Sequence, residues 1–212
     1  MADKYSNYAE LAAAEKEGID FEVVLVKRDP PRVAVIAPHA GGIEPRTGPI
    51  AKEIVGTEFT LYCFSGLKNT GNQDLHITSH HFDEPRCLDL IKDHEWIVAI
   101  HGCQKKGEHV FLSGLDEALI ADLEASLLQA GIRVRTLGHK YTGTLPRNIC
   151  NRGQSHAGVQ FELSRSFRNG DRVPGFIKAV RSVLLERQSR DGANKSIEDI
   201  PQSILRKNRG QA

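Results

Sequence analysis

Two short apolar runs constrain the fold of this chain more than any other feature. Residues 33–37 read VAVIA and residues 96–100 read WIVAI. Uninterrupted runs of this length are typical of strands that are buried on both faces, as in a parallel sheet covered by helices. Each run is followed by a histidine, because Pro38 and His39 follow the first and His101 follows the second. We therefore expect polar chemistry just beyond the ends of two buried strands.

Segments with helical and strand-like patterns alternate along the rest of the chain. We expect helices at residues 7–16, 47–55, 82–93, 116–129 and 174–188, and further strands at 21–27, 59–64, 109–112, 133–137 and 159–163. This alternation predicts an α/β fold, a single domain with a mostly parallel mixed sheet and helices on both faces. We assign residues 1–188 to this domain and residues 189–212 to a polar C-terminal tail.

Composition excludes several classes of function. The 28 lysines and arginines nearly balance the 27 aspartates and glutamates, so no strong field attracts nucleic acid or an anionic membrane. The N-terminal segment lacks the apolar core of a secretory signal, and no run approaches the length of a membrane span. The four cysteines form no CxxC pair, which favours free thiols in a reducing compartment. We expect a cytoplasmic monomer.

The strand ends offer a set of metal ligands. His39 and Glu44 follow one buried strand and His101 follows another, so in a parallel sheet the three side chains converge at one edge. Two histidines and a carboxylate with an open fourth position are typical of one hydrolytic zinc ion, which polarises a carbonyl and lowers the pKa of its water. The alternative is that each histidine only satisfies a local hydrogen bond, as most histidines do.

A carboxylate in a third apolar strand is the candidate general base. Glu162 lies within VQFEL, residues 159–163, where an unpartnered carboxylate is costly. We favour a role as the base that takes the proton of the attacking water, and apolar surroundings are expected to raise its pKa. The alternative is a buried ion pair with Arg152 or Arg165.

Two polar loops supply candidate substrate contacts. Asn151 and Arg152 precede the strand of Glu162, and a guanidinium with a neighbouring amide suits a substrate carboxylate. Arg147 adds positive charge to the same loop. The histidine-rich stretch HITSHHFDEP is interpreted as support for the metal ligands or as a substrate contact. Its candidate residues are His76, His80 and His81.

Five motifs together resemble the poly-γ-glutamate hydrolase family of phages and bacilli. They are PHAGGIEPRT (38–47), LHITSHHFDEPRC (75–87), VAIHGC (98–103), NICNRG (148–153) and GVQFELS (158–164). The resemblance extends from Tyr5 to Leu185. It implies a fold like that of zinc carboxypeptidases and hydrolysis of γ-glutamyl amide bonds in poly-γ-glutamate by a metal-activated water.

The same resemblance implies roles for individual residues. It makes His39, Glu44 and His101 the ligands of one Zn²⁺, and Glu162 the base. Asn151 and Arg152 resemble the carboxylate-binding pair of zinc carboxypeptidases. Four residues separate His39 from Glu44, where the wider group of carboxypeptidases has two.

Two rival interpretations of the function stay open at the level of sequence. The first is a zinc amidase or peptidase that acts on short γ-glutamyl peptides or peptidoglycan peptides. The second is a non-catalytic protein of the same fold that binds a polyanion through its basic loop. The expected cytoplasmic location is compatible with an extracellular polymer, because a phage-related enzyme of this kind would reach the polymer after cell lysis.

Overall fold

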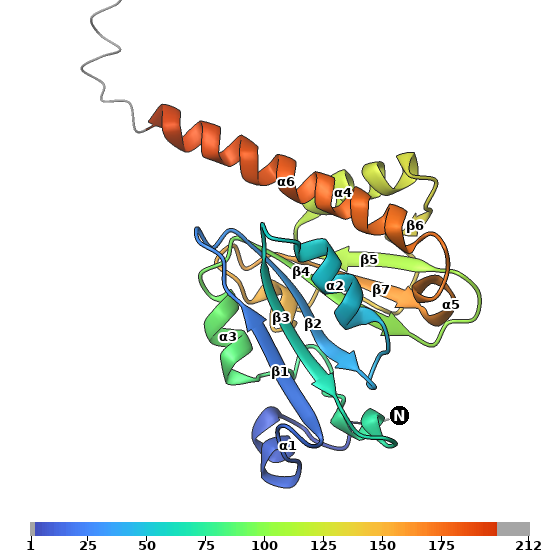
Figure 1. Ribbon diagram of the computed structural model, residues 1–212. Helices are drawn as coiled ribbons and strands as arrows, with labels where there is room; N and C mark the ends of the chain where they lie inside the picture. Colours follow the sequence, from blue (N-terminus) through green and yellow to red (C-terminus); the bar gives the residue numbers. More distant parts are fainter. Residues whose placement is uncertain (1–2, 199–212) are drawn as a thin grey trace, which may run out of the picture.

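A seven-stranded mixed sheet forms the centre of the computed structural model, which describes residues 3–198 (Figure 1). The strands are ordered β1-β3-β2-β4-β7-β5-β6 across the sheet. Their bounds are β1 Phe21–Val26, β2 Val33–Gly41, β3 Thr60–Gly66, β4 Trp96–Cys103, β5 Val110–Gly114, β6 Val134–Arg135 and β7 Val159–Ser164. Four neighbouring pairs are parallel, and only β1–β3 and β5–β7 are antiparallel. The predicted mostly parallel mixed sheet is confirmed.

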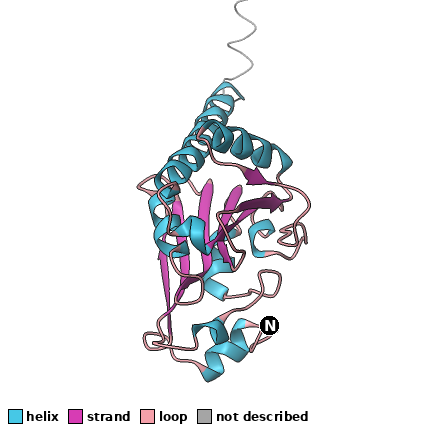
Figure 2. Ribbon diagram, turned by 90° about the vertical axis from the view of Figure 1, so that its right-hand side faces the viewer, coloured by secondary structure: helices cyan, strands magenta, loops and turns pink. Residues whose placement is uncertain are grey.

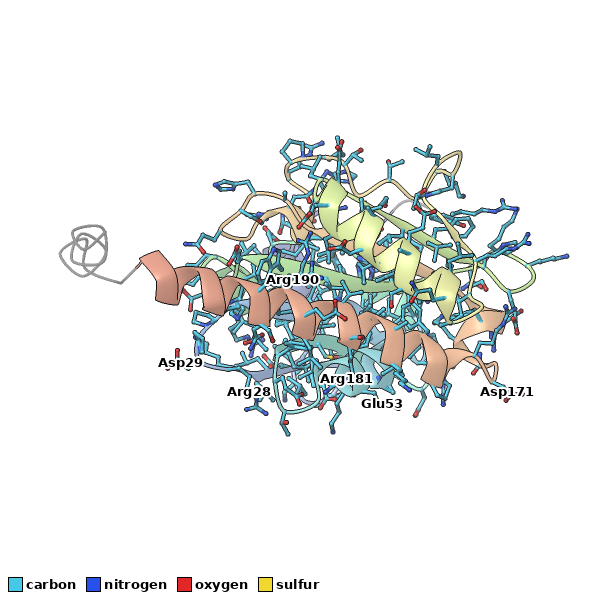
Figure 3. The ribbon with its side chains drawn as sticks, turned by 90° about the horizontal axis from the view of Figure 1, so that it is seen from above. Arg28, Asp29, Glu53, Asp171, Arg181 and Arg190 are labelled. Carbon is cyan, nitrogen blue, oxygen red and sulfur yellow. The ribbon has the colours of Figure 1, made fainter. Side chains whose placement is uncertain are left out.

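Helices cover both faces of the sheet, as predicted (Figures 1 and 2). On one face lie α2 Thr47–Val55, α4 Glu117–Gln129 and α6 Val173–Glu198. On the other lie α1 Tyr8–Ala14, α3 Pro85–Ile91 and the short helix η2 Ile149–Asn151. The remaining short helices are η1 Asn72–Leu75 and α5 Arg165–Arg168. Figure 3 shows α4 and α6 side by side across the first face, where Arg181 of α6 donates to the carbonyl of Ile54 at 2.6 Å.

The alternation of side chains along the central strands produces two separate cores. Val33 and Val35 of β2 point to the core under α2, α4 and α6, whereas Ala34 and Ile36 point to the core under α1 and α3. All four are fully buried or nearly so. A strand that serves two cores must be apolar at every position, which explains the uninterrupted runs in the sequence.

Both central strands extend further than predicted, through their histidines. β2 continues to Gly41 with a shift in its register against β3 between Ala37 and Ala40, so Pro38 lies at an irregularity and not at the strand end. β4 continues to Cys103 because His101 and the two residues after it pair with β7. The strand predicted at 133–137 is only two residues long, Val134–Arg135. Leu137 is 87% exposed and does not pack in either core.

Several helix boundaries also differ from prediction. Asn7 caps α1, which begins at Tyr8 and ends at Ala14, and α3 begins only at Pro85, after the capping side chain of Glu84. α6 is longer than predicted, because its backbone stays helical to Glu198. The first part of the expected C-terminal tail is therefore helix, and residues 199–212 lie outside the described residues. Among the helices of residues 3–198, none combines the length and the apolar character needed to cross a membrane.

Candidate metal centre

Adjacent strands and a tight turn bring the three predicted ligands together. His39 lies in β2 and His101 in the neighbouring β4. Glu44 follows β2 in a tight turn, in which the backbone N–H of Glu44 donates to the carbonyl of His39 at 2.8 Å. Gly41 starts the turn with φ +64°, and a Cβ there would lie 2.4 Å from the carbonyl oxygen of Gly66. Only glycine fits such a position, so the glycines allow the chain to fold Glu44 back toward His39.

The ligand atoms converge on one point. The Nδ1 atoms of His39 and His101 are 3.1 Å apart, and the Glu44 carboxylate lies 3.4 Å from the first and 3.7 Å from the second. One ligand atom of each residue lies within 4.8 Å of the others. Both imidazoles are almost wholly buried. This donor set, two imidazole nitrogens and a carboxylate oxygen, is suited to a zinc ion with an open position.

Neighbouring groups hold each ligand in an orientation that suits a metal. His39 donates from Nε2 to the carbonyl oxygen of Ile77 at 2.8 Å, which leaves Nδ1 with its lone pair toward the centre. His101 Nε2 lies 3.3 Å from the hydroxyl of Ser79. The N–H of Gly102 donates to Glu44 Oε2 at 2.7 Å. The residues present therefore fit a metal ion through Nδ1 of both histidines.

The ionisation of the three ligands follows from their burial and their mutual contacts. Burial lowers the pKa of His101 to about 3, so its ring is neutral at physiological pH. Burial also disfavours charge on His39, but the Glu44 carboxylate, the bond to the Ile77 carbonyl and the charge of Asp3 together raise the pKa of His39. Burial opposes ionisation of Glu44, but the charge and hydrogen bond of His39, together with His101 and the Gly102 N–H, lower its pKa overall. A carboxylate is thus kept ionised beside the two rings.

Glu162, the candidate base, lies in the same cleft as this centre. Its position in β7 is directly opposite His101 in the parallel register of β4 and β7. Both residues line a cleft of about 490 Å³ together with His39, Glu44, His76 and Lys140. Burial and the nearby charge of Glu44 raise the pKa of Glu162 well above its usual value, and the charges of Arg168 and Lys140 oppose this only in part. The direction is the one expected for a proton-accepting carboxyl group.

The histidine-rich stretch divides between the cleft and the surface beyond it. His76 lines the cleft, and its ring centroid is 4.1 Å from that of His39. His80 and His81 instead pack against each other, with ring centroids 4.2 Å apart, and neither is among the residues that line the cleft.

The predicted pair Asn151 and Arg152 is not brought into the cleft. The Asn151 amide is 1% exposed, its nitrogen donates to the carbonyls of Gly143 and Leu145, and its oxygen accepts the N–H of Gly158. These bonds hold the loop before β7 in place. Arg152 is partly buried and donates to the carbonyl of Phe82 at 3.4 Å. Arg147 is exposed on the same loop.

Two residues near the centre escaped the sequence interpretation. Asp3 accepts from His76 Nδ1 at 2.7 Å, and the sequence gives no sign of a contact across 73 positions. Arg168 is 1% exposed, and its guanidinium lies over Gly102, where a Cβ would approach it to 2.5 Å. It also donates to the carbonyl of Pro45, next to Glu44. Apart from Phe167, the neighbours of Arg168 in the sequence are polar, so the sequence gives no sign of its burial.

Solved structures that resemble this one include a bacteriophage poly-γ-glutamate hydrolase. That structure has a TM-score of 0.84 and 30% identity, over 89% of this chain and 99% of the phage chain. A zinc-free apo structure of YndL has a TM-score of 0.77 and 32% sequence identity, over 86% of this chain and 98% of the YndL chain. A carboxypeptidase A-like protein of Shewanella denitrificans OS-217 has a TM-score of 0.51 and 14% identity, over 76% of this chain and 59% of that chain. This similarity shows a likeness of fold alone.

Sequence comparison leads to the same group of proteins. YndL of Bacillus subtilis (strain 168) is 39% identical over 168 residues, which is 78% of this chain and 66% of YndL. The chain thus matches slightly less than two thirds of that relative's length. The model of the poly-γ-glutamate hydrolase family matches residues 5–171, which include every predicted ligand and Glu162. This chain belongs to the poly-γ-glutamate hydrolase family.

Proposed function

We propose that the protein is a zinc-dependent hydrolase that cleaves γ-glutamyl amide bonds of poly-γ-glutamate. The observation that carries the proposal is the convergence of His39, Glu44 and His101 beside Glu162 in one cleft. Membership of the family supports the substrate, and the zinc-free form of a relative supports the identity of the metal. One ion would be held by Nδ1 of both histidines and by the Glu44 carboxylate.

The chain's own residues would perform the proton transfers. When bound, zinc supplies a Lewis acid that polarises a carbonyl and promotes ionisation of water. Glu162 takes the proton of the water that attacks the amide carbonyl, and its raised pKa lets it pass that proton to the leaving nitrogen. Ile77 and Ser79 keep the two rings in place during these steps.

Binding of the substrate carboxylates requires cationic groups near the cleft. Lys140 lines the cleft and its charge acts on Glu162, so it is well placed to attract an anionic chain. The assignment of Arg152 with Asn151 to a substrate carboxylate stays a prediction. Asn151 would have to give up the bonds that hold its loop, so we give Lys140 the first role in attracting carboxylates.

Replacement of the base tests the catalytic part of the proposal. Glu162→Gln should lower kcat on poly-γ-glutamate by about 10²-fold or more, because an amide cannot accept the proton. Zinc content should stay at one ion per chain, since Glu162 is not one of the proposed ligands. The measurement is the rate of appearance of new amino termini, together with metal analysis. Unchanged turnover in this variant would remove Glu162 from the mechanism.

Replacement of a ligand tests the metal. His101→Ala should lose bound zinc and activity together, because only two ligands remain. His81→Ala is a matched control, since its ring is exposed and lies outside the cleft. Zinc retained at full occupancy in His101→Ala, with turnover intact, would contradict the proposed centre. A panel of poly-γ-glutamate and short γ-glutamyl peptides, compared by kcat/KM, then fixes the substrate length.

A further inference from the structure

The N-terminal segment is attached to the rim of the metal cleft by a carboxylate. Asp3 is mostly buried, with 15% of its side chain exposed, and it makes two hydrogen bonds to the segment that forms one wall of the cleft. Its Oδ1 lies 2.7 Å from His76 Nδ1, and its Oδ2 accepts the backbone N–H of Thr78 at 2.6 Å. The Asp3 side chain thus bonds to the residues that precede and follow Ile77, which are His76 and Thr78.

The two bonded residues affect the orientation of the proposed metal ligand His39 through two different contacts. The carbonyl of Ile77, between the two bonded residues, accepts from His39 Nε2 at 2.8 Å. The ring of His76 lies against the ring of His39, with centroids 4.1 Å apart and planes 35° apart. Asp3 therefore stabilises both the acceptor that orients His39 and the ring that packs on it.

The Asp3 carboxylate also determines which nitrogen of His76 carries the proton. An ionised carboxylate only accepts hydrogen bonds, so Nδ1 of His76 must be the donor. In the neutral ring, Nε2 is then unprotonated and lies on the far side of the ring from Asp3. The His76 side chain is 31% exposed and lines the cleft. The ring can thus present Nε2 to substrate as an acceptor for an amide N–H.

We propose that Asp3 is a positioning residue of the active site. Its bond to His76 orients that ring and fixes its tautomer, and its bond to the Thr78 N–H holds the backbone that positions the carbonyl of Ile77. The proposal rests on the proposed function. Asp3 precedes the residues 5–171 that the family model matches, so family membership does not imply this role.

Two substitutions separate the two bonds. Asp3→Asn keeps an oxygen for the Thr78 N–H but turns an NH₂ group toward His76 Nδ1, which then has to accept and moves the ring proton to Nε2. Asp3→Ala removes both bonds. We expect kcat on poly-γ-glutamate to fall about 10-fold in both variants. Zinc affinity, measured by competition with a chelator, should fall about 10-fold in Asp3→Ala only.

Glu15→Gln is the matched control. Glu15 accepts from the Lys4 ammonium at 3.4 Å and from the Tyr5 hydroxyl at 2.6 Å, so this substitution also loosens the N-terminal segment, and Glu15 is not among the residues that line the cleft. Its kcat and zinc affinity should stay within twofold of the wild type. An effect as large as that of Asp3→Asn would show that docking of the segment matters and the tautomer does not, which would overturn the proposal.

Nitrogen-15 NMR of the histidine rings gives a readout that is independent of activity. In the zinc-free wild type, the His76 proton should be on Nδ1, and in Asp3→Asn on Nε2. A wild-type ring protonated on Nε2, or full turnover in Asp3→Asn, would refute the proposal. A wild type that neither binds zinc nor cleaves the polymer would instead refute the proposed function, while the NMR result would still decide whether Asp3 sets the tautomer.

Discussion

The buried histidines of this chain have pKa values shifted in opposite directions, depending on which groups each ring faces. His39 is buried beside Glu44, and the attraction of that carboxylate raises its pKa. His101 is equally buried, but the pull of Glu44 does not offset burial there, and its pKa falls to about 3. His94 lies far from the cleft, with Nδ1 bonded to the carbonyl of Leu90 and a buried Nε2 that has no hydrogen-bond partner. Burial lowers the pKa of His94 as well.

The lowered pKa of His94 predicts acid sensitivity. Because its pKa is lower in the folded protein than the usual 6.5, the unfolded chain binds a proton that the folded protein refuses. The contribution of this residue to stability is present above about pH 6.5 and is lost as the pH falls, by at most about 1.4 kcal/mol per pH unit. His94→Gln should flatten the fall in the free energy of unfolding between pH 7 and 5, measured by urea unfolding with chelator present. An unchanged slope would contradict this account.

The site residues that could be predicted from sequence are those on buried strands. His39, His101 and Glu162 interrupt or follow apolar runs, and the order of parallel strands places such residues at one edge. Asn151 ends the short helix η2 in a polar stretch, where the sequence cannot show whether an amide faces substrate or holds its own backbone. Asp3 is beyond any local pattern, because its partners lie more than seventy positions away.

At the scale of elements, β4 and α5 together support the Glu44 carboxylate. Gly102 of β4 donates its N–H to Glu44, and the Arg168 guanidinium at the end of α5 lies over the same glycine. Arg168 also reaches the carbonyl of Pro45, and its own carbonyl accepts from Arg46 at 3.1 Å. The turn after β2 is therefore held from both sides, which keeps the largely buried Glu44 carboxylate in one place without a metal.

Gly102→Ala tests this arrangement. The new Cβ would lie 2.5 Å from the centre of the Arg168 guanidinium, which is buried and bonded, so the guanidinium or the strand must shift. We expect a loss of about 1–3 kcal/mol in the free energy of unfolding and weaker zinc binding. Gly175→Ala in α6 is the control, since its Cβ would meet nothing closer than 3.9 Å, and helix propensity favours alanine by about 1 kcal/mol. Equal stability of the two variants would show that the contact is easily relieved.

The elements themselves were predictable where their patterns were long, and their ends were not. The apolar runs revealed β2 and β4, but the pairing of Cys103 with Ser164 that prolongs β4 depends on a strand about sixty residues away. The predicted helix at 82–93 is shorter because Glu84 caps α3 and bonds the hydroxyl of Tyr62. Such boundaries are set by tertiary partners, which a local pattern does not contain.

At the scale of the whole molecule, the metal centre joins parts of the chain that belong to different layers. The ligands come from β2, from the turn after it and from β4, and their supports come from the 76–79 segment and from α5. The cleft thus lies at the carboxyl ends of the central strands β2, β4 and β7. A ligand bound there connects elements that otherwise interact through the central strands, so zinc should act on global stability as well as on catalysis.

Zinc binding should accordingly raise the midpoint of thermal unfolding. A ligand present at 100 times its dissociation constant adds about 2.7 kcal/mol to the folded state, which corresponds to roughly 5–10 °C for a domain of this size. The measurement is calorimetry of the chelator-treated protein with and without added zinc. His101→Ala should show no such rise, because Nδ1 of His101 is one of three proposed ligands. Equal rises in the two proteins would place the stabilising zinc elsewhere, for example at the exposed ring of His81. A rise confined to the wild type would connect metal, fold and cleft in a single measurement.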